Sequence, residues 1–258
     1  MSDSANQPTS DYESSSPGER RVFATTSWSM VLQASDPENP TAAREALANL
    51  CEAYWFPLYS FIRRKGNGRD EAEDLTQAFF AELLEKERLN RADRERGRFR
   101  TFLLTSLNNF ISNDWREKQA LKRGGGRTPI SFDFDDADQR YTNLPHHELT
   151  PEKIFERNWA FALLEQTMAN VRSQYEDSGK ATLFEELKGV ITGQAVLSYE
   201  AIAQRLEMKE GAIKVAVHRL RQRYGEQLRM QIARTIDDPA NVDVELQALF
   251  SALNPESA

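Results

Sequence analysis

Cysteine is nearly absent from this 258-residue chain, which contains only Cys51. A single thiol cannot form an internal disulfide, and such a chain suits a reducing compartment. Long apolar runs are also missing, and none approaches the roughly 20 residues that span a bilayer. The first 21 residues are polar and acidic, unlike the basic and then apolar start of a secretory signal. We therefore expect a cytoplasmic protein without a membrane segment.

Alternating apolar and polar residues, the pattern of a half-buried strand, are nearly absent as well. Glycine and proline are sparse within segments that have helical periodicity, so the sequence predicts an all-α fold. Pro151 suits a first helical turn with Thr150 as its N-cap, whereas Pro57 should kink or break the helix around it. The expected helices cover about 41–62, 70–86, 98–122, 182–190 and 242–253, together with the segment from 151.

The sequence predicts two helical domains joined by a flexible acidic linker. The N-terminal tail is rich in serine and acidic residues and is expected to be disordered. The linker is acidic and dotted with aromatic residues, and it lacks periodicity. The expected division is a tail at 1–25, a first domain at 26–127, the linker at 128–150, a second domain at 151–236 and an amphipathic extension at 237–258.

Charge is distributed unevenly along the chain, whose net charge is −7. Residues 88–127 contain 11 basic and 4 acidic side chains, a balance of +7, and residues 198–234 contain 8 and 4, a balance of +4. Residues 131–165 and 235–258 each carry −5, from 8 acids against 3 bases and from 5 acids against none. Two local basic patches favour two separate contacts with nucleic-acid phosphates, although charged blocks are often only solvated helix faces.

The second basic patch lies in a segment with the pattern of a helix-turn-helix, LSYEAIAQRLEMKEGAIKVAVHRLRQRYGEQLR. Ser198 suits the N-cap of a short first helix, and Ile202, Ala203 and Leu206 share one side of it. The second helix has an apolar stripe, while its cations point outward or to the flanks. In a helix-turn-helix such a second helix enters the major groove. The alternative is a helical hairpin with a solvated basic face.

The residues of an enzyme site do not come together in the sequence. Gly124 to Gly126 follow a helix instead of preceding one, as a phosphate-binding loop would. Cys51 has no evident histidine partner, and His146 and His147 lack further ligands at metal-binding spacing. We therefore expect a protein that is not an enzyme and that needs neither a metal nor a cofactor.

Three blocks of the sequence resemble extracytoplasmic-function (ECF) RNA polymerase sigma factors, in a subgroup with extended termini. DEAEDLTQAFFAELLEK resembles the core-binding helix of that family, and GRFRTFLLTSLNNFISNDWREKQALKRGG resembles its minus-ten helix. SYEAIAQRLEMKEGAIKVAVHRLRQRY resembles its C-terminal promoter-binding region, and the blocks occur in the family's order. The resemblance implies a bacterial sigma factor that binds core RNA polymerase and directs it to promoter DNA.

The resemblance also implies roles for individual residues. An acidic helix face would contact the polymerase, through Asp70, Glu73, Asp74, Gln77 and Phe80, with a core position open for Phe80. A polar face would hold the melted minus-ten element, through Asn108, Asn109, Asn113, Arg116, Lys118, Lys122 and Arg123. The recognition helix would read the minus-thirty-five element, through Lys209, Glu210, Gly211, Lys214, Val215, His218, Arg219, Arg221 and Arg223.

The sequence departs from the family at the helix-turn-helix and in the minus-ten helix. The turn is Glu207, Met208 and Lys209, where the family usually has Gly or Asn first and Ser or Thr as the N-cap. A left-handed Glu207 would cost on the order of 1 kcal/mol, and Lys209 is a poor cap. Asn113 stands where Asp is commoner and Asn108 where Arg is commoner, so base preference does not transfer.

Two other functions fit the same residues. A helix-turn-helix regulator would bind duplex DNA without polymerase, and a helical scaffold would have no salt-dependent affinity for DNA. Regulation is equally open, because an anti-sigma protein, phosphorylation by a kinase or the chain's own extensions would each fit.

Overall fold

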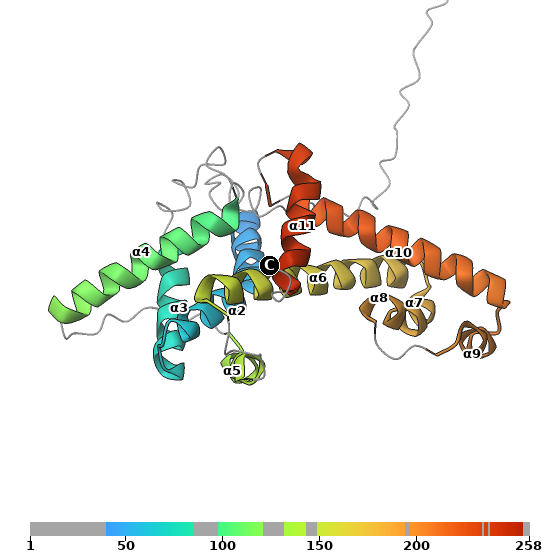
Figure 1. Ribbon diagram of the computed structural model, residues 1–258, viewed down its shortest axis with the longest axis horizontal. Helices are drawn as coiled ribbons and strands as arrows, with labels where there is room; N and C mark the ends of the chain where they lie inside the picture. The colour runs from blue at the N-terminus through green and yellow to red at the C-terminus, as the bar shows by residue number, and fades with distance from the viewer. Residues whose placement is uncertain are drawn as a thin grey trace, which may run out of the picture.

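The computed structural model describes residues 40–84, 98–120, 132–142, 149–193, 197–233, 235–236 and 238–254. All regular structure in these ranges is helical, which confirms the predicted all-α class (Figure 1). The predicted N-terminal tail lies outside the described residues. The helices are α2 (Pro40–Arg64), α3 (Arg69–Leu84), α4 (Phe99–Ala120), α5 (Phe134–Thr142), α6 (Pro151–Asp177), α7 (Ala181–Leu187), α8 (Gly189–Thr192), α9 (Tyr199–Arg205), α10 (Glu210–Ala233), the short 3-10 helix η3 (Pro239–Asn241) and α11 (Val242–Leu253).

Two helices begin at the caps that the sequence predicts. The Thr150 hydroxyl accepts a hydrogen bond from the Lys153 amide at 3.3 Å, and Pro151 occupies the first turn of α6. The Ser198 hydroxyl accepts one from the Ala201 amide at 3.2 Å at the start of α9. Each side chain satisfies an amide that has no partner within its helix, so these two boundaries follow from local chemistry.

Pro57 does not break the first helix, as α2 continues through it from Pro40 to Arg64. A proline inside a helix removes one backbone hydrogen bond and costs about 3 kcal/mol or more. The helix is deeply buried around it, with Leu58, Tyr59 and Phe61 at 0% exposure. Burial of these large side chains therefore outweighs the local cost.

The first core, a cluster of buried residues around α2, is dominated by aromatic side chains. α2 packs along the first part of α6, which contributes Phe155 and Trp159. Phe79 of α3 meets Phe110 of α4 edge-on, with ring centroids 5.7 Å apart. The C-terminal end of α10 and the last helix, α11, close the cluster through Leu228, Ile232 and Leu249.

The second core is smaller and lies at the other end of α6. Val171 and Tyr175 of α6 pack there with residues of α7, α9 and the first half of α10. α6 and α10 therefore each contribute to both cores, and Figure 1 shows them running side by side. Two domains joined by a flexible linker are not what this arrangement shows, because continuous helices connect the cores.

The part of the predicted linker that the structure describes is packed and partly helical. Helix α5 buries Phe134 and Ala137, and Phe132 stacks on Trp55 of α2 at 5.2 Å with an interplanar angle of 10°. The Tyr59 hydroxyl of α2 donates to the Asp138 carboxylate at 3.0 Å. Packing of aromatic rings thus fixes residues 132–142 against α2, although their acidic composition led us to expect a flexible segment. Residues 128–131 and 143–148 of the predicted linker lie outside the described residues.

None of the helices in the described ranges combines the length and the apolar composition of a membrane-spanning segment.

Candidate functional site

The acidic face predicted to bind polymerase lies at the start of α3. Asp70 and Asp74 are exposed there, one turn apart, and Glu73 and Gln77 are partly exposed. Within the described residues neither Asp70 nor Asp74 forms an ion pair, so their charges face solvent. Acidic side chains at this end also suit the helix dipole. The helix therefore presents two carboxylates that a basic partner can reach.

Arg69 joins this face to helix α5. Its guanidinium pairs with Glu73 at 2.8 Å and, on its other arm, with Asp135. These two carboxylates hold the pKa of Arg69 above its usual value, mainly through the hydrogen bond to Glu73. Glu73 is thus already engaged inside the molecule, which leaves Asp70 and Asp74 as the available carboxylates of the predicted set.

Phe80 belongs to the first core and not to this face. It is 1% exposed, and its ring lies 5.5 Å from that of Phe132. The sequence had left a contact and a core position open for it. A side chain so deeply buried cannot touch a partner unless the core opens, so the structure favours the core position.

The polar side chains of α4 lie on the outer surface of the first core. Asn109 and Asn113 are exposed, and Asn108 is partly exposed. The Lys65 ammonium, just after the end of α2, donates to the Asn108 amide oxygen at 2.7 Å. One of the three amides is therefore held in place before any ligand arrives. The predicted DNA contacts Lys122 and Arg123, and the side chains of Arg116 and Lys118, lie outside the described residues.

The aromatic residues of α4 serve packing. Phe99 and Phe110 are 0% and 5% exposed, and Phe102 stacks beside Phe99 with centroids 5.9 Å apart. Rings buried in this way are not available to stack on unpaired bases. Phe99 and Phe110 are therefore core residues, and Phe102 is partly buried against the same core.

Helices α9 and α10 occupy the segment for which the sequence predicts a helix-turn-helix. Ile202 and Ala203 of α9 pack against Ile213, Val217 and Leu220 of α10, and all five are buried. A turn of four residues, 206–209, separates the two helices, and α10 begins at Glu210 as predicted. The geometry of the motif thus rests on the apolar stripes that the sequence contains.

The turn adopts the left-handed conformation that its sequence makes unfavourable. Glu207 has a φ of 52°, and it is the only non-glycine residue with positive φ in the described ranges. The Met208 amide then donates to the Ala203 carbonyl at 2.9 Å, which closes the end of α9. The turn therefore has the usual geometry of a helix end, although the side chain of Glu207 makes the left-handed conformation energetically unfavourable.

The exposed side of α10 carries most of the residues predicted to bind DNA. Lys209, Gly211, His218 and Arg221 are exposed, and Val215 is 49% exposed. Lys214 pairs with Glu210 one turn before it, at 2.8 Å, and this carboxylate raises the pKa of the ammonium. The charge of Lys214 is thus partly compensated, whereas His218 and Arg221 have no ion-pair partner among the described residues.

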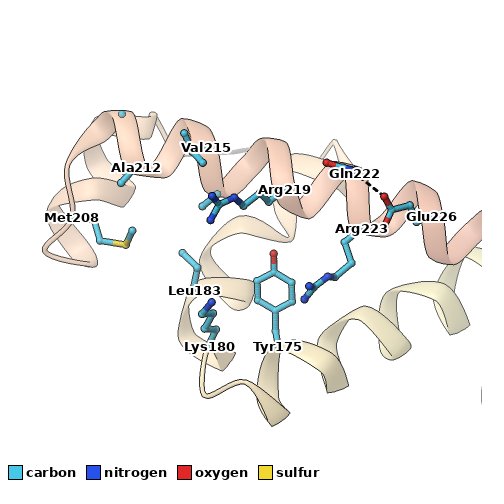
Figure 2. Close-up of a pocket in the computed structure, with 12 residues that line it drawn as sticks. Tyr175, Lys180, Leu183, Met208, Ala212, Val215, Arg219, Gln222, Arg223 and Glu226 are labelled. Carbon is cyan, nitrogen blue, oxygen red and sulfur yellow. Dashed lines mark hydrogen bonds between the residues drawn. The ribbon is translucent and has the colours of Figure 1, made fainter. Parts of the chain in front are cut away.

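Arg219 and Arg223 line a groove of about 730 Å³ between α10, the end of α6 and the start of α7 (Figure 2). The guanidinium of Arg223 lies over the Tyr175 ring, 5.5 Å from its centroid. Lys180 enters from the opposite wall, beside Leu183, and Met208 of the turn lies at one end. The groove therefore gathers three cations and one carboxylate, Glu226, over a partly apolar floor, and its net positive charge suits an anionic surface.

Tyr175 and Lys180 were not among the predicted site residues. Tyr175 comes at the end of a long helix, and Lys180 is an isolated cation before a short one. Neither position carries a motif, because only the packing of α6 against α10 brings them beside Arg219 and Arg223. No group of residues suited to hold a metal ion occurs in the described part of the chain.

Residues 50–121 match the family model of sigma-70 region 2. The matched segment covers most of α2, all of α3 and α4, and thus the two polar surfaces of the first core. It amounts to under a third of the chain and does not include α9 or α10. No curated protein and no solved structure matches the chain. The match supports a sigma-70 type of role in promoter recognition, with core RNA polymerase and promoter DNA as the interaction partners.

Proposed function

We propose that this chain is a bacterial, cytoplasmic sigma factor of the ECF type. It binds core RNA polymerase, holds the melted minus-ten element with the first-core surfaces and reads the minus-thirty-five element with α10. The observation that carries the proposal is the match to sigma-70 region 2 over residues 50–121, in a chain whose helices α9 and α10 pack around a short turn. Both segments are assigned to binding, and neither is assigned to catalysis.

Polymerase binding is assigned to the start of α3. Asp70 and Asp74 are exposed one turn apart, with Gln77 on the same face and partly exposed. Charged pairs across an interface add specificity and faster association, and reversing one charge opposes a basic partner directly. Phe80 is not part of this contact, since it is buried in the first core.

Strand capture is assigned to α4. Its exposed amides, Asn109 and Asn113, can donate to and accept from base edges, and Lys65 fixes the orientation of Asn108. The basic residues that follow α4 would hold phosphates, which fix position without reading sequence.

Duplex reading is assigned to the first half of α10. Gly211, Lys214 and Val215 are exposed near its start, where a recognition helix approaches base edges. His218 and Arg221 lie farther along and suit phosphate contacts. Arg219 and Arg223 line the groove beside Tyr175. They therefore lie on the side of α10 and away from its N-terminal end, where the base contacts are assigned.

Pull-down with purified core RNA polymerase, followed by run-off transcription on promoter fragments, tests the proposal. Asp74→Arg should abolish polymerase binding and leave the helical content unchanged. Glu71→Arg is the matched control, because it reverses an exposed charge on the same helix outside the predicted set. Normal polymerase affinity of the Asp74 variant would reject the assignment of α3.

The second arm tests the division of labour. Arg219→Glu should weaken promoter binding by the holoenzyme and leave polymerase affinity unchanged. Arg172→Glu makes the same charge change on an exposed part of α6 and should alter neither. DNA binding by the chain alone, equal to that of the holoenzyme, would instead identify a regulator that acts without polymerase. No salt-dependent DNA binding in either form would indicate a scaffold.

A further inference from the structure

A carboxylate of the last helix is buried against the first core. Glu245 of α11 is 1% exposed, although α11 lies at the C-terminal end of the chain. Its carboxylate pairs with Arg98 at 3.0 Å, just before α4, and with Arg100 in the first turn of α4. Burial of a charge is costly without partners, so a buried glutamate with two arginines is a specific contact.

Arg100 connects this contact to α6. It is 4% exposed, and its guanidinium also pairs with Glu156 at 2.8 Å and lies 4.3 Å from the centroid of the Trp159 ring. Burial lowers the pKa of Arg100, and the Glu156 charge opposes that shift. One guanidinium is thus held by two carboxylates from two helices and by an aromatic face, which fixes its position tightly.

The other side of α11 contacts the helix that carries the predicted recognition surface. α11 packs against both α6 and α10, and Asp243 pairs with Arg229 of α10 at 2.6 Å. Figure 1 shows α11 standing across the C-terminal end of α10, beside the N-terminal part of α6. The same short helix therefore connects the start of α4 to the end of α10.

α11 leaves the predicted binding surfaces open. With α11 in place, Asp74 of α3, Asn113 of α4 and His218 of α10 remain exposed. A helix that covered these surfaces would compete with polymerase or DNA, but this one packs elsewhere. Its position suits a role in placing two binding helices relative to each other.

We propose that α11 is a clasp that sets the placement of α4 relative to α10, and that Glu245 is the positioning residue that fastens it. The consequence of the clasp rests on the proposed function. In a sigma factor, a fixed placement of the two helices makes the factor prefer one separation between the two promoter elements. Without the clasp, each helix still binds its own element, but the preference for their separation weakens.

The first experiment measures the placement itself, without polymerase or DNA. Donor and acceptor labels are attached at Thr105 of α4 and Gln222 of α10, which are exposed and lie outside the predicted contacts. The unmodified clasp should give one narrow distance distribution, and Glu245→Gln should broaden it or add a longer component. Gln247→Glu is the matched control, because it changes the charge at an exposed position of the same helix and should leave the distribution narrow.

A chain that ends at Asn241 provides the second variant, since it removes α11 with its buried charge and leaves Arg100 with Glu156. It should keep its remaining helices, by circular dichroism, and show the same broadened distances. Narrow distributions in both variants would overturn the proposal. So would general loss of helicity in both, because α11 would then be a part of the core that folding requires instead of a clasp.

The second experiment measures run-off transcription from promoters whose two elements are separated by different lengths. Coupling between two sites commonly changes affinity by about tenfold. The wild-type factor should therefore lose roughly tenfold in transcription when the two promoter elements are moved from their optimal separation. The Glu245→Gln variant should lose much less. Polymerase affinity should not change. An unaltered profile in the variant refutes the consequence of the clasp. Absence of promoter-dependent RNA from the wild type refutes the proposed function instead, and the distance measurement then judges the clasp alone.

Discussion

The two cores of this protein share two helices but are built from different side chains. The first core packs many aromatic rings, whereas the second consists mainly of aliphatic residues around Tyr175 and Phe184. Their surfaces also differ at individual residues. Lys65 holds the Asn108 amide on the first, while His218 and Arg221 on the second project into solvent. Asn108 is therefore preorganised, whereas His218 and Arg221 stay free to adapt to a ligand.

Core truncation should separate the two cores most strongly. Phe155→Ala removes a fully buried ring from the first core and should cost about 3–5 kcal/mol of unfolding free energy. Ile213→Ala removes a fully buried side chain from the second core and should lower the unfolding free energy by about 2–5 kcal/mol. The loss of stability should be local to α9 and the start of α10. Urea unfolding followed by tryptophan fluorescence reports the first core, where Trp55 and Trp159 pack.

Hydrogen exchange of the α9 and α10 amides reports the second core in the same samples. If Ile213→Ala shifts the tryptophan transition as much as it shifts exchange, the cores unfold as one unit. The shared helices α6 and α10 would then couple them fully, and the distinction between two cores would apply to composition alone.

Alkaline pH should weaken the first core through Cys51. Burial raises the pKa of its thiol from 9.0 to about 12, so the thiol ionises more readily in the unfolded chain. Its contribution is therefore complete below pH 9 and is lost as the pH rises from 9 towards 12, by up to about 1.4 kcal/mol per pH unit. Urea unfolding at pH 8 to 10.5 measures this slope.

Cys51→Ala is the comparison for that slope. Burial also raises the pKa values of Tyr59 and Tyr224, so some alkaline loss remains in both proteins. The variant is less stable at neutral pH because it loses packing, yet its stability should fall less steeply above pH 9. Parallel curves would show that the thiol reaches solvent.

A substitution in the turn between α9 and α10 should raise the stability of the second core. Among the described residues, the first core contains no non-glycine residue with positive φ at which the same gain could be made. Glu207→Gly removes the side-chain penalty of a residue at φ 52° and should raise stability by about 1 kcal/mol, or roughly 2–4 °C in Tm. Glu207→Ala keeps a side chain in the same conformation and should bring no such gain. A larger gain from alanine would identify the carboxylate, and not the backbone, as the unfavourable group.

Local features of the fold could be predicted from the sequence, and long-range packing could not. Thr150 and Ser198 cap their helices as expected, and the limits of α11 follow from its periodicity. Burial within α11 does not follow that periodicity, because the apolar Val244 and Phe250 are each 54% exposed. Glu245 is buried instead because Arg98 and Arg100, which are distant in sequence, neutralise it.

The site shows the same division. The stripes of α9 and α10 predict the helix-turn-helix, because each depends on residues three or four apart. Neither the groove with Lys180 nor the packed α5 has a local signal. Acidic composition predicted a free linker, yet Phe134 is buried and Phe132 is partly buried beside Trp55. Apolar contacts across the fold outweighed the charge of the segment.

The smallest change in stability is expected at Lys65, the residue that ties down the first surface. Its hydrogen bond to Asn108 is exposed to solvent, so Lys65→Met should alter the unfolding free energy by less than about 0.5 kcal/mol. Under the proposed function it should nevertheless weaken binding of single-stranded minus-ten oligonucleotide to the holoenzyme, because the Asn108 amide loses its fixed orientation. Lys65→Arg keeps a donor and should preserve binding. If both variants bind like the wild type, preorganisation of Asn108 has no role, and the two surfaces differ less than their contacts indicate.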